Sequence, residues 1–135
     1  MAKLIALLSS GKGSWAIINA LLKSSNWDHV YLVCNDYSYE KFEVKDPQKV
    51  TKLKFDEKKL VDSMNKLSEF FKKNIEGIDV AVNINSGSGM EHMSLVSAIL
   101  RAGFGIRFVY VDNDELKEFE IVEGHIIDED EAYGI

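Results

Sequence analysis

The sequence contains little of what marks secreted, membrane-spanning or metal-binding proteins. It has a single cysteine, Cys34, so it cannot form an internal disulfide and suits a reducing cytoplasm. No apolar run approaches the roughly 18 residues of a membrane-spanning helix, and residues 1–8 are too short and too weakly basic for a secretory signal. The three histidines and Cys34 have no metal-site spacing. We expect a cytoplasmic protein with no membrane contact, no metal and no cofactor.

Positive charge is also scarce. Sixteen Lys and Arg residues stand against 22 Asp and Glu residues, for a formal net charge of -6. Neutralisation of phosphates dominates affinity for long nucleic acid, so we do not expect long nucleic acid as a partner. A small anion held by backbone amides is compatible with this charge. The acidic run 128–131 is interpreted as a solvated end of the chain.

The apolar pattern predicts a single α/β domain over residues 1–135. Short, nearly continuous apolar runs at 4–8, 29–34, 80–84 and 106–111 are typical of buried parallel strands. Helical patterns lie between them, after Ser14, after Asp56 and after Gly89, with Ser14 and Asp56 as predicted caps. The order predicts a Rossmann-like open sheet, mostly parallel, with helices on both faces.

Two parts of the chain have weaker patterns. Residues 41–44 and 50–55 alternate partly, so both are candidate strands, and an irregular excursion around Pro47 fits equally well. Residues 116–122 are typical of an antiparallel edge strand after the Asn113-Asp114 turn signal. Residues 125–127 are a further candidate strand.

Two Gly/Ser-rich loops, 9–14 and 85–90, each join a predicted strand to a predicted helix. Such loops lie side by side where the strand order of an open sheet reverses, and ligands bind there. Glycine allows close backbone approach, while hydroxyls, free amides and the helix dipole favour an anion. Alternatively, these turns only connect elements. The candidate ligand-binding residues are Ser9, Ser10, Gly11, Lys12, Gly13, Ser14, Asn85, Ser86, Gly87, Ser88, Gly89, Met90, Glu91 and His92.

Known catalytic motifs are missing from these loops. Neither has the Walker A pattern or the dinucleotide pattern G-x-G-x-x-G, and the elbow G-x-S-x-G does not occur. The candidate catalytic groups are Lys12 and His92, the latter as a general acid or base or as a structural hydrogen-bonding residue. Trp15 either stacks on a base or packs against the sheet, and Met90 and Met93 are expected in the core or a pocket wall.

The segment DVAVNINSGSGMEHMSLVSAILRAG, together with the earlier LIALLSSGKGSWAIINALL, resembles the CARF domain, the CRISPR-associated Rossmann-like fold of antiviral defence systems. The likeness covers residues 3–112. The family turn Thr/Ser-Gly-Gly-x-Lys-x-Met-Ser is matched by Ser86, Gly87, Gly89, Met93 and Ser94, with Glu91 in place of the basic residue. The loop LLSSGKGSW also resembles, less closely, the phosphate loop of ATP-pyrophosphatases without its aspartate.

The CARF resemblance implies a homodimer that binds a cyclic oligoadenylate across its two-fold axis, with contacts from residues 9–14 and 85–92. Some members of the family cleave this ligand. The family's usual effector domain has no room in this sequence, so a lone domain of this kind is expected to degrade its ligand, to buffer it, or to act through a separate effector protein. Three hypotheses follow: a nucleotide-binding sensor, a ring-nuclease-type phosphodiesterase assisted by His92 or Lys12, and a non-enzymatic assembly subunit with an empty pocket.

Overall fold

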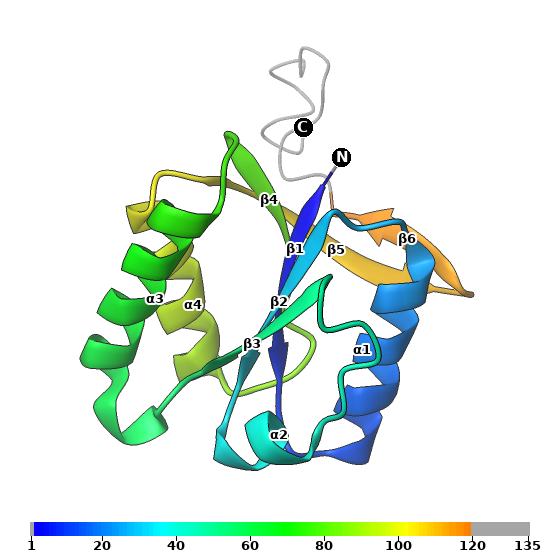
Figure 1. The fold of residues 1–135 in the computed structure, drawn as a ribbon, viewed down its shortest axis with the longest axis horizontal. Helices are drawn as coiled ribbons and strands as arrows, with labels where there is room; N and C mark the ends of the chain where they lie inside the picture. Colours follow the sequence, from blue (N-terminus) through cyan, green and yellow to red (C-terminus); the bar gives the residue numbers. More distant parts are fainter. Residues whose placement is uncertain (1, 120–135) are drawn as a thin grey trace, which may run out of the picture.

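The computed structural model describes residues 2–119 and contains one six-stranded sheet between helices (Figure 1). The elements in chain order are β1 (Lys3–Leu8), α1 (Lys12–Ser24), β2 (His29–Cys34), α2 (Asp36–Lys41), β3 (Val50–Lys54), the 3₁₀ helix η1 (Glu57–Lys59), α3 (Leu60–Asn74), β4 (Asp79–Asn83), α4 (Gly89–Arg101), β5 (Gly105–Asp112) and β6 (Glu115–Glu118).

The sheet has the strand order β3-β2-β1-β4-β5-β6. The first five strands are parallel, and β6 pairs antiparallel with β5. From β1 the chain moves outward to β2 and β3, then returns to the other side of β1 and moves outward again. The order therefore reverses between β1 and β4, and the loops that follow these two strands meet at that point. The predicted α/β architecture is confirmed.

Buried apolar side chains on both faces of β1 explain why the strand is central. Leu4, Ala6 and Leu8 pack toward Ile18 and Leu21 of α1. The alternating residues of the strand pack on the opposite face, in the cluster that contains side chains of α3 and α4. Figure 1 shows α1 on one side of the sheet and α3 with α4 on the other. A strand covered on both faces must be apolar throughout, which is the pattern that the sequence showed.

The candidate strand at 41–44 does not form, and the alternative of an irregular excursion around Pro47 is the one observed, whereas the candidate strand at 50–55 is confirmed as β3. Before this excursion, residues 36–41 form the helix α2. The Asn35 side chain accepts from the Ser38 N–H at 2.9 Å and so caps that helix. Ser38 is fully buried, and its hydroxyl donates to the Leu8 carbonyl oxygen at 2.7 Å. A short helix held by tertiary contacts leaves little periodic signal.

Helix α1 also begins earlier than predicted. Its N-cap is Gly11, not Ser14, and Gly11 provides no side-chain cap. Ser14 lies in the first turn and directs its hydroxyl toward other serines. Asp56, predicted as the cap of the long helix, instead caps the preceding 3₁₀ helix: its carboxylate accepts from the Lys58 N–H at 2.9 Å at the start of η1, and α3 follows with Lys59 as its N-cap.

The turn between β5 and β6 is confirmed as a tight hairpin. Asn113 and Asp114 both have positive φ angles, 50° and 63°. This is the conformation of a type I′ turn, whose twist matches that of the flanking strands. The predicted edge strand is confirmed for Glu115–Glu118. Its remainder beyond residue 119, the candidate strand 125–127 and the acidic run 128–131 lie outside the described residues.

Within residues 2–119, no helix combines the length and the apolar composition that crossing a bilayer requires.

Candidate functional site

The two Gly/Ser-rich loops are in direct contact at the reversal point of the sheet. The backbone N–H of Ser9, after β1, donates to the hydroxyl of Ser86, after β4, at 2.9 Å. These residues are 77 positions apart in the sequence. The prediction that the two loops converge at one edge of the sheet therefore holds for the geometry.

Three serine hydroxyls form a cluster that joins the loops. Ser86 Oγ lies 2.6 Å from Ser9 Oγ and 3.0 Å from Ser14 Oγ, and the last two oxygens are 3.0 Å apart. Ser86 is only 4% exposed. Each hydroxyl donates one hydrogen and accepts others, so the three groups satisfy one another. We call Ser9, Ser14 and Ser86 the serine cluster. It is occupied by its own hydrogen bonds, and its hydroxyls are not free for a ligand unless the cluster opens.

The N-terminus of α1 is the open end of the site. Among the described residues, none accepts from the backbone N–H groups of Gly11 and Gly13. The first turn of α1 contains no acidic residue. Ser10 is exposed, and its hydroxyl accepts from the Asn35 amide at 2.9 Å. Lys12 begins the helix. Unpaired amides at a helix N-terminus without a carboxylate favour an anion.

The N-terminus of α4 is closed by its own side chains. The Ser88 hydroxyl accepts from the Glu91 N–H at 3.2 Å, and Glu91 Oε1 accepts from the Ser88 N–H at 2.9 Å. This capping box buries the carboxylate of Glu91, which is 7% exposed. Among the described residues, the amides of Gly89 and Met90 remain without an acceptor. The negative charge of Glu91 offsets the dipole here, so this helix attracts an anion less strongly than α1 does.

Gly87 is required for this loop. Its φ angle is +93°, a left-handed conformation that is strained for other residues. A Cβ atom at this position would lie 3.3 Å from Leu7 Cδ1 and 3.4 Å from Glu91 Oε1. A side chain here would therefore be strained by the backbone conformation and would also push the Leu7 and Glu91 side chains aside by a few tenths of an ångström. Gly89, by contrast, has open space around its Cα.

His92 has a structural contact in this arrangement. Its Nε2 lies 2.8 Å from the Ser86 carbonyl oxygen, so this nitrogen donates and carries the ring proton. The bond ties the first turn of α4 to the second loop. This geometry corresponds to the structural alternative for His92, because the donating nitrogen cannot act as a base while the bond persists.

Trp15 is half-buried and packs against neighbouring side chains. Its indole N–H donates to the Ser9 carbonyl oxygen at 2.9 Å. Its ring lies against Tyr37 and, edge on, against Phe42, with centroid distances of 6.1 and 5.5 Å. The packing alternative for this residue is the one observed.

Met90 and Met93 do not lie in the core, which was one of the two places predicted for them. They are 53% and 59% exposed, because the buried face of α4 is formed by residues 91, 95, 98 and 99. Leu100, 56% exposed, lies two turns further along the same outer side of the helix. The apolar pattern of α4 extends around more of the helix than the sheet can cover.

Sequence reasoning missed one polar residue beside the second loop. Asn83, 2% exposed at the end of β4, donates to the Val109 carbonyl oxygen at 2.8 Å and to Asn85 Oδ1 at 2.5 Å. It also accepts from the Asn85 N–H at 3.2 Å. A single asparagine within an otherwise apolar strand run was the signal, because a buried amide is costly unless it is hydrogen-bonded.

Cys34 ends β2 near this edge of the sheet, but its thiol is not reactive. Burial raises the pKa of its thiol to about 11, although hydrogen bonding to Ser38 and the charge of Lys52 oppose this rise. The thiolate is the nucleophilic form. A thiol with this pKa is protonated at neutral pH, so Cys34 is not a nucleophile for the site.

In the part of the chain that the structure describes, no group of three or more His, Cys, Asp or Glu side chains is arranged to hold a metal ion. No protein-family model matches the chain, and no curated protein matches it significantly.

Proposed function

We propose that this chain binds a small, phosphate-bearing nucleotide of the cyclic oligoadenylate type where its two Gly/Ser loops meet, and acts as a CARF-like sensor. The observation that carries the proposal is the contact between Ser9 and Ser86, which brings two strand-to-helix loops together at the reversal point of the sheet. Ligands of open α/β sheets bind at such points.

The first loop would supply the main phosphate contacts. The amides of Gly11 and Gly13 have no acceptor among the described residues, and Lys12 is the cation of this loop. Glu91 does not oppose this binding mode strongly, because its carboxylate faces the Ser88 N–H and is buried. The second loop would contribute the amides of Gly89 and Met90 to a lesser degree.

The proposal includes a homodimer in which the outer side of α4 forms the contact. Met90, Met93 and Leu100 are more than half exposed on this helix. Exposed apolar groups that lie together favour a protein contact. Because α4 begins at the second loop, a two-fold contact between two such helices would bring both copies of the loop near the axis, and an isologous interface presents each loop twice to a symmetric ligand.

Calorimetry with cyclic tetra-adenylate and cyclic hexa-adenylate tests the binding. The Gly13→Pro variant removes one free amide within the first helical turn, where proline is tolerated. The matched Gly13→Ala variant keeps the N–H, and a Cβ there has open space. We expect the Pro variant to bind several-fold more weakly than the Ala variant. Equal affinity would remove this amide from the site, and a Lys12→Ala protein that binds like the parent would remove Lys12.

The same samples distinguish the alternatives. Linear products after incubation with the cyclic ligand would favour the ring-nuclease hypothesis, and absence of binding at any ring size would favour an assembly subunit with an empty pocket. Size-exclusion chromatography with light scattering tests the dimer. Met93→Asp should give a monomer, whereas Val61→Asp, at a 68% exposed apolar position on α3, should not change the mass.

A further inference from the structure

A pocket of about 420 Å³ opens at the carboxyl end of β4, beside the middle of β5 and next to the second loop. Its volume lies within the range typical of small-molecule sites, roughly 300–1,000 Å³. Asn85 belongs both to the pocket wall and to the candidate loop. A part of a ligand that reached the loops could therefore extend directly into this pocket.

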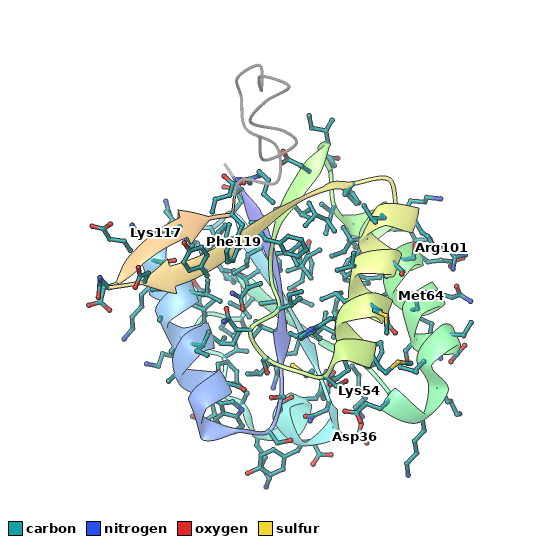
Figure 2. All side chains as sticks on the ribbon, turned by 180° about the vertical axis from the view of Figure 1, so that it is seen from behind. Asp36, Lys54, Met64, Arg101, Lys117 and Phe119 are labelled. Atoms are coloured by element: carbon teal, nitrogen blue, oxygen red, sulfur yellow. The ribbon has the colours of Figure 1, made fainter. Side chains whose placement is uncertain are left out.

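Flat apolar surfaces make up most of the pocket wall. Phe108, Tyr110 and Phe119 contribute three rings, and Val82 and Ile84 contribute aliphatic groups. The Tyr110 and Phe119 rings lie 4.6 Å apart with a tilt of 33°. Phe119 remains 60% exposed, and Figure 2 shows it beside β5 and β6, away from α4 and its Arg101. Rings arranged in this way bind another planar ring well.

The polar side of the pocket contains the exposed residue Asn85, whose amide is held by a buried neighbour. Asn83 holds Asn85 by two hydrogen bonds, one to its Oδ1 and one from its N–H. The Oδ1 atom of Asn85 therefore faces Asn83, and its Nδ2 group is directed elsewhere. Among the described residues, none accepts from this Nδ2 group. A donor fixed by a fully hydrogen-bonded buried neighbour is pre-organised for an acceptor on a ligand.

Among residues 2–119, the pocket wall contains no charged side chain. The described residues that line it are aliphatic, aromatic or amide-bearing, with no ionisable acid or base other than the Tyr110 phenol. A phosphate would find no counter-charge here, whereas an uncharged ring would be desolvated at little cost.

We propose that this pocket binds an uncharged heteroaromatic ring, such as a purine base, which stacks on Tyr110 and Phe119 and accepts a hydrogen bond from Asn85 Nδ2. The inference rests on the proposed function for the identity of the ring as the base of a nucleotide. It assigns the base to one site and the phosphate to another, with Asn85 between them.

Adenosine, which has the ring but no phosphate, is the probe. It is titrated into protein labelled at the methyl groups of Ile, Leu and Val, and NMR shifts are followed for Val82 and Ile84. We expect saturable shifts at these methyl groups. Phe119→Ala should weaken adenosine binding about tenfold, within the range for stacking of a base on an aromatic ring. Asn85→Ala should weaken it about fivefold, as the loss of one hydrogen bond to an uncharged partner does.

Two controls keep the test specific. Ile78→Ala removes an 85% exposed apolar group at the opposite end of β4, and Asn74→Ala removes an exposed amide on α3. Both should bind adenosine like the parent. Unaffected binding by Phe119→Ala, or no shift at Val82 and Ile84, would overturn the proposal. The same methyl shifts on dilution of the protein alone would also overturn it, because a second copy would then occupy the pocket.

The outcome separates this proposal from the proposed function. If cyclic tetra-adenylate binds and Phe119→Ala does not weaken it, the base pocket is wrong and the nucleotide function stands. If adenosine binds at the pocket and no cyclic oligoadenylate binds, the pocket stands and the cyclic-nucleotide function is wrong.

Discussion

Replacing Ser86 by alanine should loosen the contact between the two loops at a measurable cost in stability. The Ser86 hydroxyl accepts from the Ser9 N–H and bonds to the hydroxyls of Ser9 and Ser14. In the variant, Ser9 and Ser14 keep their mutual bond at 3.0 Å. The Ser9 N–H, however, loses its acceptor in a half-buried position.

The expected loss of stability follows from the Ser9 N–H, which is left without an acceptor. An unsatisfied buried donor costs about 1–3 kcal/mol. Ser9 retains partial access to water, so we expect Ser86→Ala to lower the free energy of unfolding by about 2 kcal/mol. Urea denaturation followed by far-UV circular dichroism gives this value from the midpoint and the slope. Amide hydrogen exchange at Ser9 should accelerate in the same variant.

The control is Ser94→Ala on α4. The Ser94 hydroxyl donates to the Met90 carbonyl oxygen within the same helix, at 2.9 Å, and joins no other segment. Its loss should change the free energy of unfolding by less than about 0.5 kcal/mol. A Ser86→Ala protein as stable as this control, with unchanged exchange at Ser9, would show that the serine cluster does not hold the loops together.

Three further predictions concern single positions. Gly87→Ala should lower the free energy of unfolding by about 1–3 kcal/mol because its φ is +93°, while Gly89→Ala, with open space at Cβ and no strain, should be neutral or stabilising in the same urea assay. Cys34 should react with a thiol reagent at neutral pH only as urea unfolds the protein, because its pKa is about 11 and its side chain is fully buried; rapid reaction of the folded protein would contradict this. Burial, and then the charge of Lys3, lower the pKa of His29, so the unfolded chain takes up the proton more readily and stability should fall as the pH drops below about 6.5; a His29→Gln protein with the same pH profile would refute the assignment.

The strands and the meeting of the loops could be predicted because both follow from general constraints. A strand covered on both faces is mostly apolar, as are the buried parts of β1 and β4 apart from Asn83. The reversal of strand order then brings the residues after these strands together, whatever their identity. No detail of side-chain geometry was needed for either step.

What the sequence did not reveal depends on side chains that find their partners only in the folded chain. The Ser14 hydroxyl was expected to cap its own helix, but it lies closer to Ser86, 72 residues away. Glu91 was expected among the ligand-binding residues, but its carboxylate accepts from the N–H of Ser88, the N-cap of its own helix. The pocket wall combines β4, β5 and Phe119, and no local pattern links those segments.

The serine cluster joins the loops without fixing a direction of hydrogen donation. A salt bridge would assign permanent signs to the two loops, whereas hydroxyl hydrogens rotate with almost no movement of the oxygens. The three hydroxyls can donate to one another in either direction around the triangle, and the loops keep their positions in both cases. A ligand oxygen that accepted one of these hydrogens would interrupt the ring of hydrogen bonds at one point. Because both loops share this ring, the binding of the ligand would affect both loops together.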